Sequence, residues 1–372
     1  LRTILKYPRQ IHAAVTSRIK IISNLNIINR QTPQDGRSAV RLEGRDIDLR
    51  VSTLPSIHGE NIVIRLLDQR AGLIPLDRLG VPEDILGPLL EVASQPQGML
   101  LVTGPTGSGK TTTLYSLLMK LRSETGSIFT IEQPIEYHLP GITQVGVNEA
   151  VSLTFASALR SILRQDPDII LVGEIRDLET AEIAVRAALT GHLVMSTVHT
   201  NSSVATITRL LDIGLDAYLV SSAVTGILAQ RLVRRICPEC REPAPVPASA
   251  VRAGLPPLQA CHRGRGCAHC QHTGFKGQIG VYEFLPMTTA LRRLISKGAS
   301  GEALWDCARS EGLVTLFEHA WRMVAEGLTT PEEVLMKVPV DSMGMIASGR
   351  SVEKAERRRT GRARGDRKER AS

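Results

Sequence analysis

The residues with the clearest chemistry form a glycine-rich run from Gly104 to Thr111, whose letters are GPTGSGKT. This run fits the G-x-x-x-x-G-K-[ST] phosphate-binding pattern at every fixed position. In that pattern backbone N–H groups surround a polyphosphate, Lys110 adds a positive charge, and the Thr111 hydroxyl ligates Mg²⁺. The sequence therefore predicts a site for ATP or GTP, formed by Gly104, Pro105, Thr106, Gly107, Ser108, Gly109, Lys110, Thr111 and Thr112.

Two acidic runs could complete such a site, because nucleotide hydrolysis needs a metal-holding carboxylate and a group that activates water. In residues 168–174, four apolar residues predict a buried strand, and Glu174 follows its carboxyl end, where ligands of open α/β sheets bind. We assign Glu174 to the metal, directly or through water, and expect Asp168 to cap or pair locally. In residues 130–137 we expect Glu136 to be the water-activating base and Glu132 its neighbour at the metal. Surface charge is the alternative for both acids.

Two histidines, His192 and His199, flank a further expected strand at residues 193–197. A single histidine is more often a structural residue than a functional one. Two histidines that flank one strand of the sheet are also consistent with residues that sense the γ-phosphate or a subunit boundary. Both are therefore candidate site residues.

The elements that must position these residues are visible in the hydrophobic periodicity. Apolar residues at helical spacing over residues 11–25 precede alternating runs at 40–42 and 47–51, with a turn at 43–46, and a further strand at 62–67. Residues 1–70 therefore read as a small α+β domain, and 71–75 as a linker. From 76 to 232, apolar runs alternate with helical patterns, which predicts a doubly wound, mostly parallel α/β sheet. Its strands are expected at 99–103, 128–132, 169–172 and 193–197, and its helices at 112–121, 155–164 and 180–190.

Two C-x-x-C pairs follow the expected core. Cys237 and Cys240 are separated from Cys267 and Cys270 by residues 241–266. Paired thiolates of this kind predict tetrahedral Zn²⁺ ligation in a structural site, with no open position for catalysis. A disulfide pairing is the weaker alternative in a cytosolic protein. The nearby His262, His269 and His272 are substitute ligands that we rank below the cysteines.

The composition sets further limits. A chain of 372 residues with 42% hydrophobic but only 3% aromatic residues favours an α/β protein of two or three domains. No apolar run reaches membrane-spanning length and no signal peptide opens the chain, so we expect a soluble, cytosolic protein. The chain begins with Leu1 and enters a helical pattern without a cap, so we expect that an upstream portion is missing.

The net charge of +8 suggests a nucleic-acid partner at first sight. Residues 351–372, however, hold nine basic and four acidic residues, which is +5 of that total. Such a tail, here residues 341–372, is most often solvated disorder. The charge distribution and the scarcity of aromatic residues therefore argue against nucleic-acid binding.

In their order along the chain, the motifs resemble those of the secretion ATPase superfamily, which comprises type II secretion ATPases and type IV pilus assembly and retraction motors. The Walker A, Asp-box, Walker B, His-box and following motifs correspond to residues 104–111, 130–136, 163–180, 190–201 and 229–232. The resemblance implies a RecA-like P-loop core and a PAS-like α+β amino-terminal domain. It also implies a tetracysteine zinc module at 233–283 and a helical carboxyl-terminal part at 284–340.

The same resemblance implies a hexamer that hydrolyses ATP with Mg²⁺ and drives pseudopilus assembly and export across the outer membrane. Its partners would be inner-membrane secretion platform proteins, at the cytoplasmic face of the inner membrane. Arg50 and Arg65 match arginines that this family sends from the small domain toward a nucleotide. Gln133 is a departure, since it stands where the family's Asp box has aspartate. The missing charge is expected to tune activity rather than to abolish it.

Several alternatives stay open at this stage. The cysteine pairs favour an assembly motor over a retraction motor. The sequences of residues 209–216 and 229–237 are more similar to those of type II secretion ATPases than to those of pilus assembly ATPases. A type IV pilus assembly ATPase is the nearest alternative. A nucleic-acid-associated ATPase and a scaffold that binds nucleotide without hydrolysing it rank lower.

Overall fold

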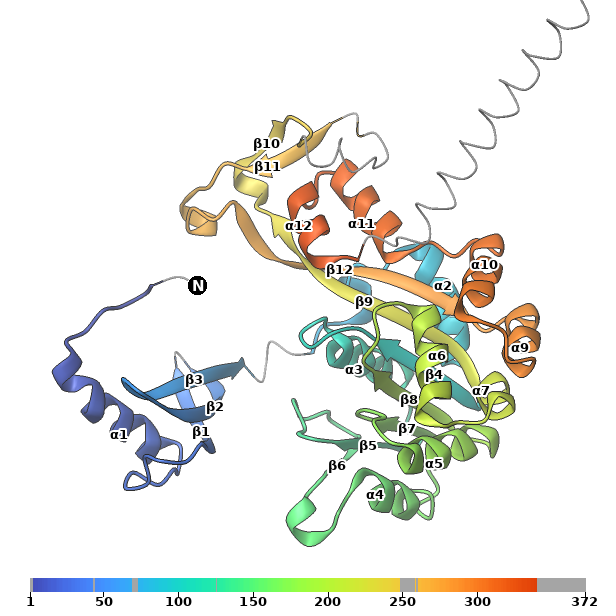
Figure 1. Cartoon of the computed structure of the whole chain (residues 1–372), viewed down its shortest axis with the longest axis horizontal. Helices are drawn as coiled ribbons and strands as arrows, with labels where there is room; N and C mark the ends of the chain where they lie inside the picture. The colour runs from blue at the N-terminus through green and yellow to red at the C-terminus, as the bar shows by residue number, and fades with distance from the viewer. Residues whose placement is uncertain are drawn as a thin grey trace, which may run out of the picture. The chain divides into compact units, whose positions relative to one another are not determined.

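The structure is a computed structural model that describes residues 3–42, 44–68, 73–124, 126–247, 258 and 260–339. The chain forms two compact units, one of Leu1–Arg78 and Thr111–Gly173, the other of Leu79–Lys110 and Glu174–Ser372. Figure 1 shows the elements of both. The expected basic tail and linker residues 71 and 72 lie outside the described residues. The domain limits stay a prediction.

An antiparallel three-stranded sheet and a helix form the amino-terminal part of the first unit (Figure 1). Strand β2 (Arg45–Ser56) pairs with β1 (Gln34–Leu42) on one side and β3 (Gly59–Asp68) on the other. The short helix η1 (Arg9–Ile11) leads into α1 (His12–Ile22), which contacts β3. The expected α+β character is confirmed. The strands are longer than their apolar runs because backbone pairing extends through polar residues at their ends.

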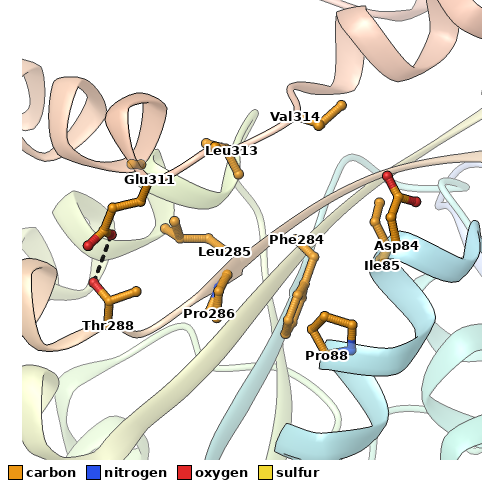
Figure 2. A pocket seen from close by; sticks show the side chains of 12 residues that line it. Asp84, Ile85, Pro88, Phe284, Leu285, Pro286, Thr288, Glu311, Leu313 and Val314 are labelled. Carbon is orange, nitrogen blue, oxygen red and sulfur yellow. Dashed lines mark hydrogen bonds between the residues drawn. The ribbon is translucent and has the colours of Figure 1, made fainter.

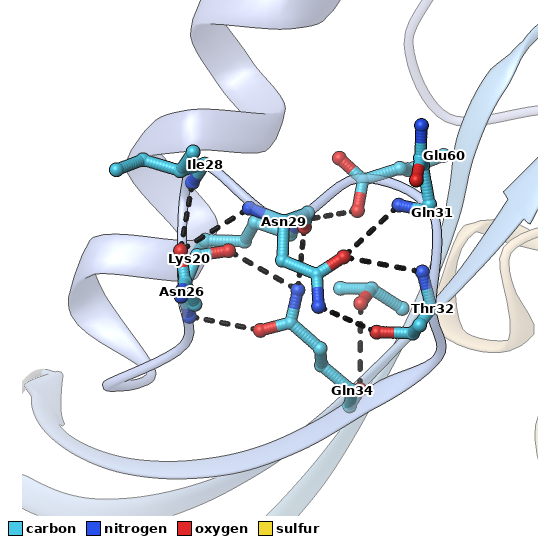
Figure 3. Close-up of polar contacts among 9 residues, drawn as sticks. Lys20, Asn26, Ile28, Asn29, Gln31, Thr32, Gln34 and Glu60 are labelled. Carbon is cyan, nitrogen blue, oxygen red and sulfur yellow. Dashed lines mark hydrogen bonds and ion pairs between the residues drawn. The ribbon is translucent and has the colours of Figure 1, made fainter.

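A buried ion pair fastens α1 to this sheet. The Lys20 ammonium pairs with the Glu60 carboxylate, and both side chains are almost fully buried. Lys20 Nζ also donates to the Asn29 carbonyl oxygen at 2.8 Å. Figure 3 shows how Asn26, Asn29 and Gln34 order the connection between α1 and β1 through further hydrogen bonds. Replacing one partner alone would leave the other charge buried and unpaired, which costs about 3–5 kcal/mol.

The rest of the first unit is an α/β layer with three parallel strands. Strand β5 (Ile128–Glu132) lies between β7 (Ile169–Val172) and β6 (Thr143–Gly146). The layer also contains α3 (Lys110–Leu121), η3 (Glu149–Val151), α4 (Phe155–Ile162) and, at the end of the first stretch, η2 (Leu76–Arg78). The expected strands at β5 and β7 and helices at α3 and α4 are confirmed. Strand β6 was not predicted, because its exposed and half-buried residues form no apolar run.

In the second unit the strand order is β12-β9-β4-β8. Strand β4 (Gly98–Thr103) runs parallel to β8 (Leu193–Val198) and β9 (Val224–Ile236), whereas β12 (Phe275–Pro286) pairs antiparallel to β9. Every residue of β4 and β8 is buried, as a strand covered on both faces requires. The expectation of a mostly parallel sheet is confirmed. The long β9 and β12 were not predicted, and the expected helical part from residue 284 begins in fact with the end of β12.

Helices α2 (Glu83–Ala93), α5 (Leu178–Leu189), α6 (Ser203–Ile213) and α7 (Ala217–Ala223) contact these strands. The helical carboxyl-terminal part is confirmed as α9 (Thr289–Ser296), α10 (Gly301–Ser310), α11 (Leu316–Ala325) and α12 (Pro331–Lys337). Each of these four helices begins after a Ser or Thr whose side chain accepts a backbone N–H, which is the usual N-cap. Among the described residues, no helix combines the length and apolar character of a membrane span.

A small module connects β9 to β12. It contains η4 (Pro238–Cys240), a two-stranded antiparallel ribbon of β10 (Arg241–Ala244) and β11 (Cys261–Gly264), and η5 (Ala268–Cys270). Three of the four paired cysteines are buried in it. Residues 248–257 and 259, in the proline-rich part of the module, lie outside the described residues.

Candidate functional site

The glycine-rich run follows β4 directly and leads into α3. Gly104, Gly107 and Gly109 adopt φ values of +150°, +77° and +88°, which favour glycine over any residue with a Cβ. A Cβ on Gly104 would clash with the Gln230 carbonyl oxygen, and one on Gly109 would lie 2.7 Å from Gln230 Nε2. The turn thus requires glycine both for its backbone conformation and for its close approach to β9.

Lys110 and Ser108 give this loop the character of an anion site. Lys110 Nζ donates to the carbonyl oxygens of Gly104 and Pro105 at 2.8 and 3.1 Å. Burial lowers the pKa of Lys110 to about 8; the neighbouring Glu174 opposes this shift and Arg231 adds to it. The Ser108 hydroxyl is buried without a hydrogen-bond partner within the described part of the chain. A partly desolvated ammonium and an unpaired buried hydroxyl fit a bound polyphosphate.

Glu174 and His199 lie with Lys110 in the second unit. Glu174 is largely buried, and its carboxylate pairs with Arg176 at 2.5 Å and lies 3.7 Å from His199 Nε2. Burial, followed by the charge of Lys110, lowers the pKa of His199, so its imidazole is neutral at pH 7. A carboxylate and a neutral imidazole beside the phosphate lysine are groups that can hold a hydrated Mg²⁺ and orient a nucleotide.

The segment that carries His199 is tied to the phosphate loop by Thr103. Its hydroxyl donates to the Val198 carbonyl oxygen at 2.9 Å and accepts from the Thr200 N–H at 3.0 Å. Thr103 is the last residue of β4 and Val198 the last of β8. These bonds hold the carboxyl ends of both strands together, at the edge where α/β sheets bind ligands.

Glu136 forms an ion pair with Arg50 on strand β2 of the three-stranded sheet. The Arg50 guanidinium donates to both Glu136 oxygens, with N···O distances of 2.7 and 3.2 Å, and to the Ile135 carbonyl oxygen at 3.3 Å. The two groups are partly exposed, so the pair is a contact that rearranges at modest cost. The structure therefore brings together two residues singled out from distant motifs.

Arg65 and a third arginine lie beside Arg50. In the antiparallel register, Arg50 is directly opposite Arg37 on β1 and Arg65 on β3. Directly opposite residues share one face of a sheet, so the three guanidinium groups form a row. Arg37 was not singled out in the sequence, because its place beside Arg50 depends on strand register.

Glu132 is placed differently from our expectation at a metal. It is 4% exposed, and its carboxylate accepts hydrogen bonds from the Tyr115 hydroxyl, from Thr130 Oγ1 at 2.6 Å and from Gln144 Nε2 at 3.3 Å. Both oxygens are thus occupied by neighbours, as a buried carboxylate requires.

Three further residues have local roles. His192 precedes β8, at the opposite end of the strand from His199, and its Nδ1 lies 3.0 Å from the Ala187 carbonyl oxygen. The structure therefore does not bring it to the phosphate loop. Asp168 accepts the Ser127 N–H at 2.7 Å, so its expected local role is confirmed. The amide of Gln133 donates to Glu149 Oε1 at 3.2 Å, where an aspartate would meet a like charge.

Glu283, a buried carboxylate of the second unit, was not predicted from the sequence as a site residue. Glu283 on β12 accepts hydrogen bonds from Ser203 N at 2.7 Å and Leu316 N at 3.1 Å, the first residues of α6 and α11. Burial raises the pKa of Glu283, while these hydrogen bonds and the charge of Arg231 oppose the shift. Arg231 donates to Asn201 in the His199 segment at 3.1 and 3.2 Å. No local pattern marks Glu283, since its partners come from remote helices.

The four paired cysteines converge on one point. Their sulfur atoms all lie within 4.8 Å of one another, with distances of 3.9 Å from Cys237 to Cys267 and 3.8 Å from Cys270 to both Cys240 and Cys267. A disulfide needs about 2.05 Å, so none is formed here. Four sulfurs about 2.3 Å from a tetrahedral Zn²⁺ are spaced by about 3.8 Å, which matches these distances.

Backbone donors support the same conclusion. The N–H groups of Gly266 and Gly274 donate to the sulfurs of Cys240 and Cys270 at 3.3 Å, and the N–H of Cys267 donates to Cys270 at 3.2 Å. The Cys267 N–H lowers the pKa of Cys270 to about 6, whereas burial raises the pKa of Cys237 and Cys240, so the spacing of the sulfurs carries the metal assignment. None of the three neighbouring histidines belongs to this cluster among the described residues.

A separate pocket of about 240 Å³ lies between α2, β12 and the segment joining α10 to α11. Figure 2 shows Ile85, Pro88, Phe284 and Leu285 along it, with Thr288 donating to Glu311 at 2.8 Å. Its lining is mainly apolar and includes no residue that the sequence suggested for catalysis or metal binding.

Comparison with known proteins supports the interpretation of the motifs. The profile of the family described as "Type II/IV secretion system protein" matches residues 1–336. Type II secretion system protein HxcR of Pseudomonas aeruginosa is 49% identical over 335 residues, which are 90% of this chain and 68% of the relative. Type II secretion system ATPase E of Vibrio cholerae is 45% identical over 339 residues, 90% of this chain and 67% of the relative.

Solved structures show the same fold. The pilus retraction motor PilT, solved with bound ADP, has a TM-score of 0.61 and 31% identity, covering 82% of this chain and 77% of that one. The ATPase DotB of Yersinia pseudotuberculosis has a TM-score of 0.65 over 86% of this chain and 80% of its own, and at 22% identity it supports the fold alone. The expected α/β ATPase fold is therefore confirmed.

Proposed function

This chain belongs to the family of type II/IV secretion system proteins, and we propose that it is the ATPase of a type II secretion system. The observation that carries the proposal is the phosphate loop, where three glycines turn the backbone around a desolvated Lys110 and a buried Ser108 hydroxyl that has no partner among the described residues. The identity of 45–49% to type II secretion proteins favours this system over pilus assembly.

In the proposed reaction, the loop N–H groups and Lys110 bind the β- and γ-phosphates of ATP. Thr111 and Glu174 would hold Mg²⁺, which supplies positive charge to the phosphates. Glu136 orients the attacking water and accepts its proton. His199, as a neutral imidazole, hydrogen-bonds near the γ-phosphate without repelling Lys110.

Arg50 has two positions in this scheme. Paired with Glu136, it occupies both carboxylate oxygens, so these are not free to orient a water molecule. Turned to the transferred phosphoryl group, it would release Glu136 and stabilise the developing charge, as arginine fingers do. Arg65 lies next to it in the same row and is proposed to assist. Movement of the small sheet would then couple the catalytic state to the shape of a proposed hexamer.

We propose Zn²⁺ as a structural ion in the four-cysteine cluster, and inner-membrane secretion platform proteins as the partners that receive the motion. The ATPase would act at the cytoplasmic face of the inner membrane. There it would drive pseudopilus assembly and, through it, protein export across the outer membrane. Mass measurement with a non-hydrolysable ATP analogue tests the hexamer.

The first test is hydrolysis by Lys110→Ala. The substitution removes the charge at the outer phosphates, so kcat/KM for ATP is expected to fall at least about 10²-fold. A coupled phosphate-release assay with Mg²⁺ measures it. The matched control is Lys120→Ala, which removes an exposed lysine from the same helix and is expected to change kcat/KM less than about twofold. Equal rates in both variants would remove the phosphate loop from the mechanism.

A second test uses the lowered pKa of Lys110. Because this pKa is about 8 in the nucleotide-free chain, raising the pH from 7 to 9.5 deprotonates the ammonium that binds phosphate. Bound phosphate favours the protonated form of Lys110, so ATP binding above pH 8 is coupled to the uptake of a proton. The Kd for ATP should therefore rise by at most about tenfold per pH unit above pH 8. Isothermal titration calorimetry measures it. Lys110→Ala should bind weakly and without this slope; a flat profile in the unmodified chain would contradict the assignment.

A further inference from the structure

The phenol of Tyr115 connects the phosphate-loop helix to the segment that carries Glu136. Tyr115 lies on α3, four residues after Thr111, and its side chain is fully buried. Residues four apart lie on one face of a helix, so Tyr115 follows any shift of the helix end that receives the phosphates.

The Tyr115 hydroxyl has a buried carboxylate as its partner. It donates to Glu132 Oε2, and the backbone of Glu136 and Tyr137 lies near enough to oppose the rise in its pKa. The rings of Tyr115 and Tyr137 also meet edge to face, with centroids 6.3 Å apart. Tyr115 thus packs directly against the residue that follows Glu136.

Glu132 completes a second connection to the same segment. Its other oxygen accepts from Gln144 Nε2, which also donates to the Tyr137 carbonyl oxygen at 3.0 Å. Gln144 Oε1 accepts the Leu139 N–H at 2.8 Å. Residues 136–139 are therefore held from α3 through Tyr115 and from β6 through Gln144, with the Glu132 carboxylate between them.

The proton of the Tyr115 hydroxyl stays on the phenol oxygen, from which it is donated to Glu132. Burial, followed by the charge of Glu132, raises the pKa of Tyr115 far above its ordinary value. The phenol stays a donor at every working pH, and the buried carboxylate stays satisfied. A network whose members are all paired is rigid, which is what the placement of a base requires.

We propose that Tyr115 and Glu132 are positioning residues that fix the place of Glu136 at the end of its segment. The inference rests on the proposed function, in which Glu136 activates water. A misplacement of about 1 Å in a reacting group can cost about 10²-fold in rate, so the loss of one buried hydroxyl has a measurable effect. Glu132 then acts through Glu136 rather than at the metal.

The decisive variant is Tyr115→Phe, which removes a single oxygen atom. We expect kcat for ATP hydrolysis to fall about 10- to 100-fold while the Kd for ATP stays within about threefold, because the phosphate contacts are intact. The matched control is Tyr218→Phe, whose side chain is on α7 and 69% exposed, and which should leave kcat unchanged. An unchanged kcat in Tyr115→Phe would overturn the proposal, as would a fall in affinity alone.

A double-mutant cycle shows through which residue Tyr115 acts. In a Glu136→Gln background the further loss from Tyr115→Phe, measured as single-turnover rates, should shrink to less than about twofold, since the positioned group is gone. Additive losses would overturn the proposal. If Glu136→Gln alone left hydrolysis unchanged, the assignment of the base in the proposed function would fail instead, so the two failures are distinguishable.

Glu132→Gln keeps the proposal testable if Tyr115→Phe does not fold, which circular dichroism and the melting temperature would reveal. This variant keeps the volume and one acceptor for the phenol. We expect kcat to fall about tenfold and the Mg²⁺ concentration for half-maximal activity to stay within about twofold. A clear rise in the Mg²⁺ requirement would place Glu132 at the metal and contradict its positioning role; an unchanged kcat would contradict it as well.

Discussion

Replacing Glu136 by Gln is expected to lower kcat for ATP hydrolysis by about 10²- to 10⁴-fold, the contribution typical of a general base. The amide keeps the size of the side chain and an acceptor for the Arg50 guanidinium, which contacts both Glu136 oxygens. It cannot accept the proton of the attacking water. The Kd for ATP should therefore stay within about threefold, because only a transition-state interaction is removed. Steady-state hydrolysis and equilibrium binding of a fluorescent ATP analogue measure the two quantities.

The control for this variant is Glu149→Gln in the same unit. Glu149 is an exposed carboxylate that accepts the Gln133 amide and has no proposed part in the chemistry. We expect kcat to change less than about twofold, as for most surface substitutions. If Glu149→Gln lowered kcat as much as Glu136→Gln, the effect would reflect the charge of the region rather than a base at Glu136.

Loss of the metal from the four-cysteine cluster is expected to unfold the module that contains it. Structural Zn²⁺ contributes about 10–16 kcal/mol of apparent binding free energy in zinc-finger peptides at pH 7, and the core of this cluster consists of the cysteines themselves. A Cys237→Ser/Cys270→Ser double variant should lose the bound zinc, which is expected at one equivalent per chain. It should also become sensitive to proteases between residues 237 and 275. Plasma mass spectrometry and limited proteolysis measure these changes.

Cys307→Ser is the matched control. Cys307 is a half-buried thiol on α10, outside the cluster. Its replacement should leave zinc content and protease resistance unchanged. Full zinc content in the Cys237→Ser/Cys270→Ser variant would contradict the assignment, and protection without zinc would show that the module is held by packing alone.

Much of the site was predictable because its signals are local. The phosphate loop needs glycine at three positions, because other residues rarely adopt the φ values found there. Its pattern is therefore contained in eight consecutive residues. The cysteine pairs are similarly compact, and the four sulfurs do converge. Buried strands such as β4 and β8 were predictable because their continuous apolar runs reflect burial on both faces.

The elements that were missed depend on distant partners. Strand β6 has no apolar run, and it is a strand because it pairs with β5. The long β9 and β12 pair with each other across the cysteine module, so their length follows from a register that no local window contains. Glu283 was missed for the same reason, because its carboxylate caps two helices far apart in the chain.

The sequence by itself determined the phosphate loop, the cysteine cluster and the α/β class of this protein, because glycine conformation, ligand spacing and hydrophobic periodicity act over a few residues. Only the tertiary structure decided which acids are free to act. It buried Glu132 against Tyr115, paired Glu136 with Arg50, and separated His192 from His199 by the length of a strand. Burial and charge pairing arise between segments brought together by folding, so the role of a carboxylate or a histidine cannot be read from its neighbours in sequence.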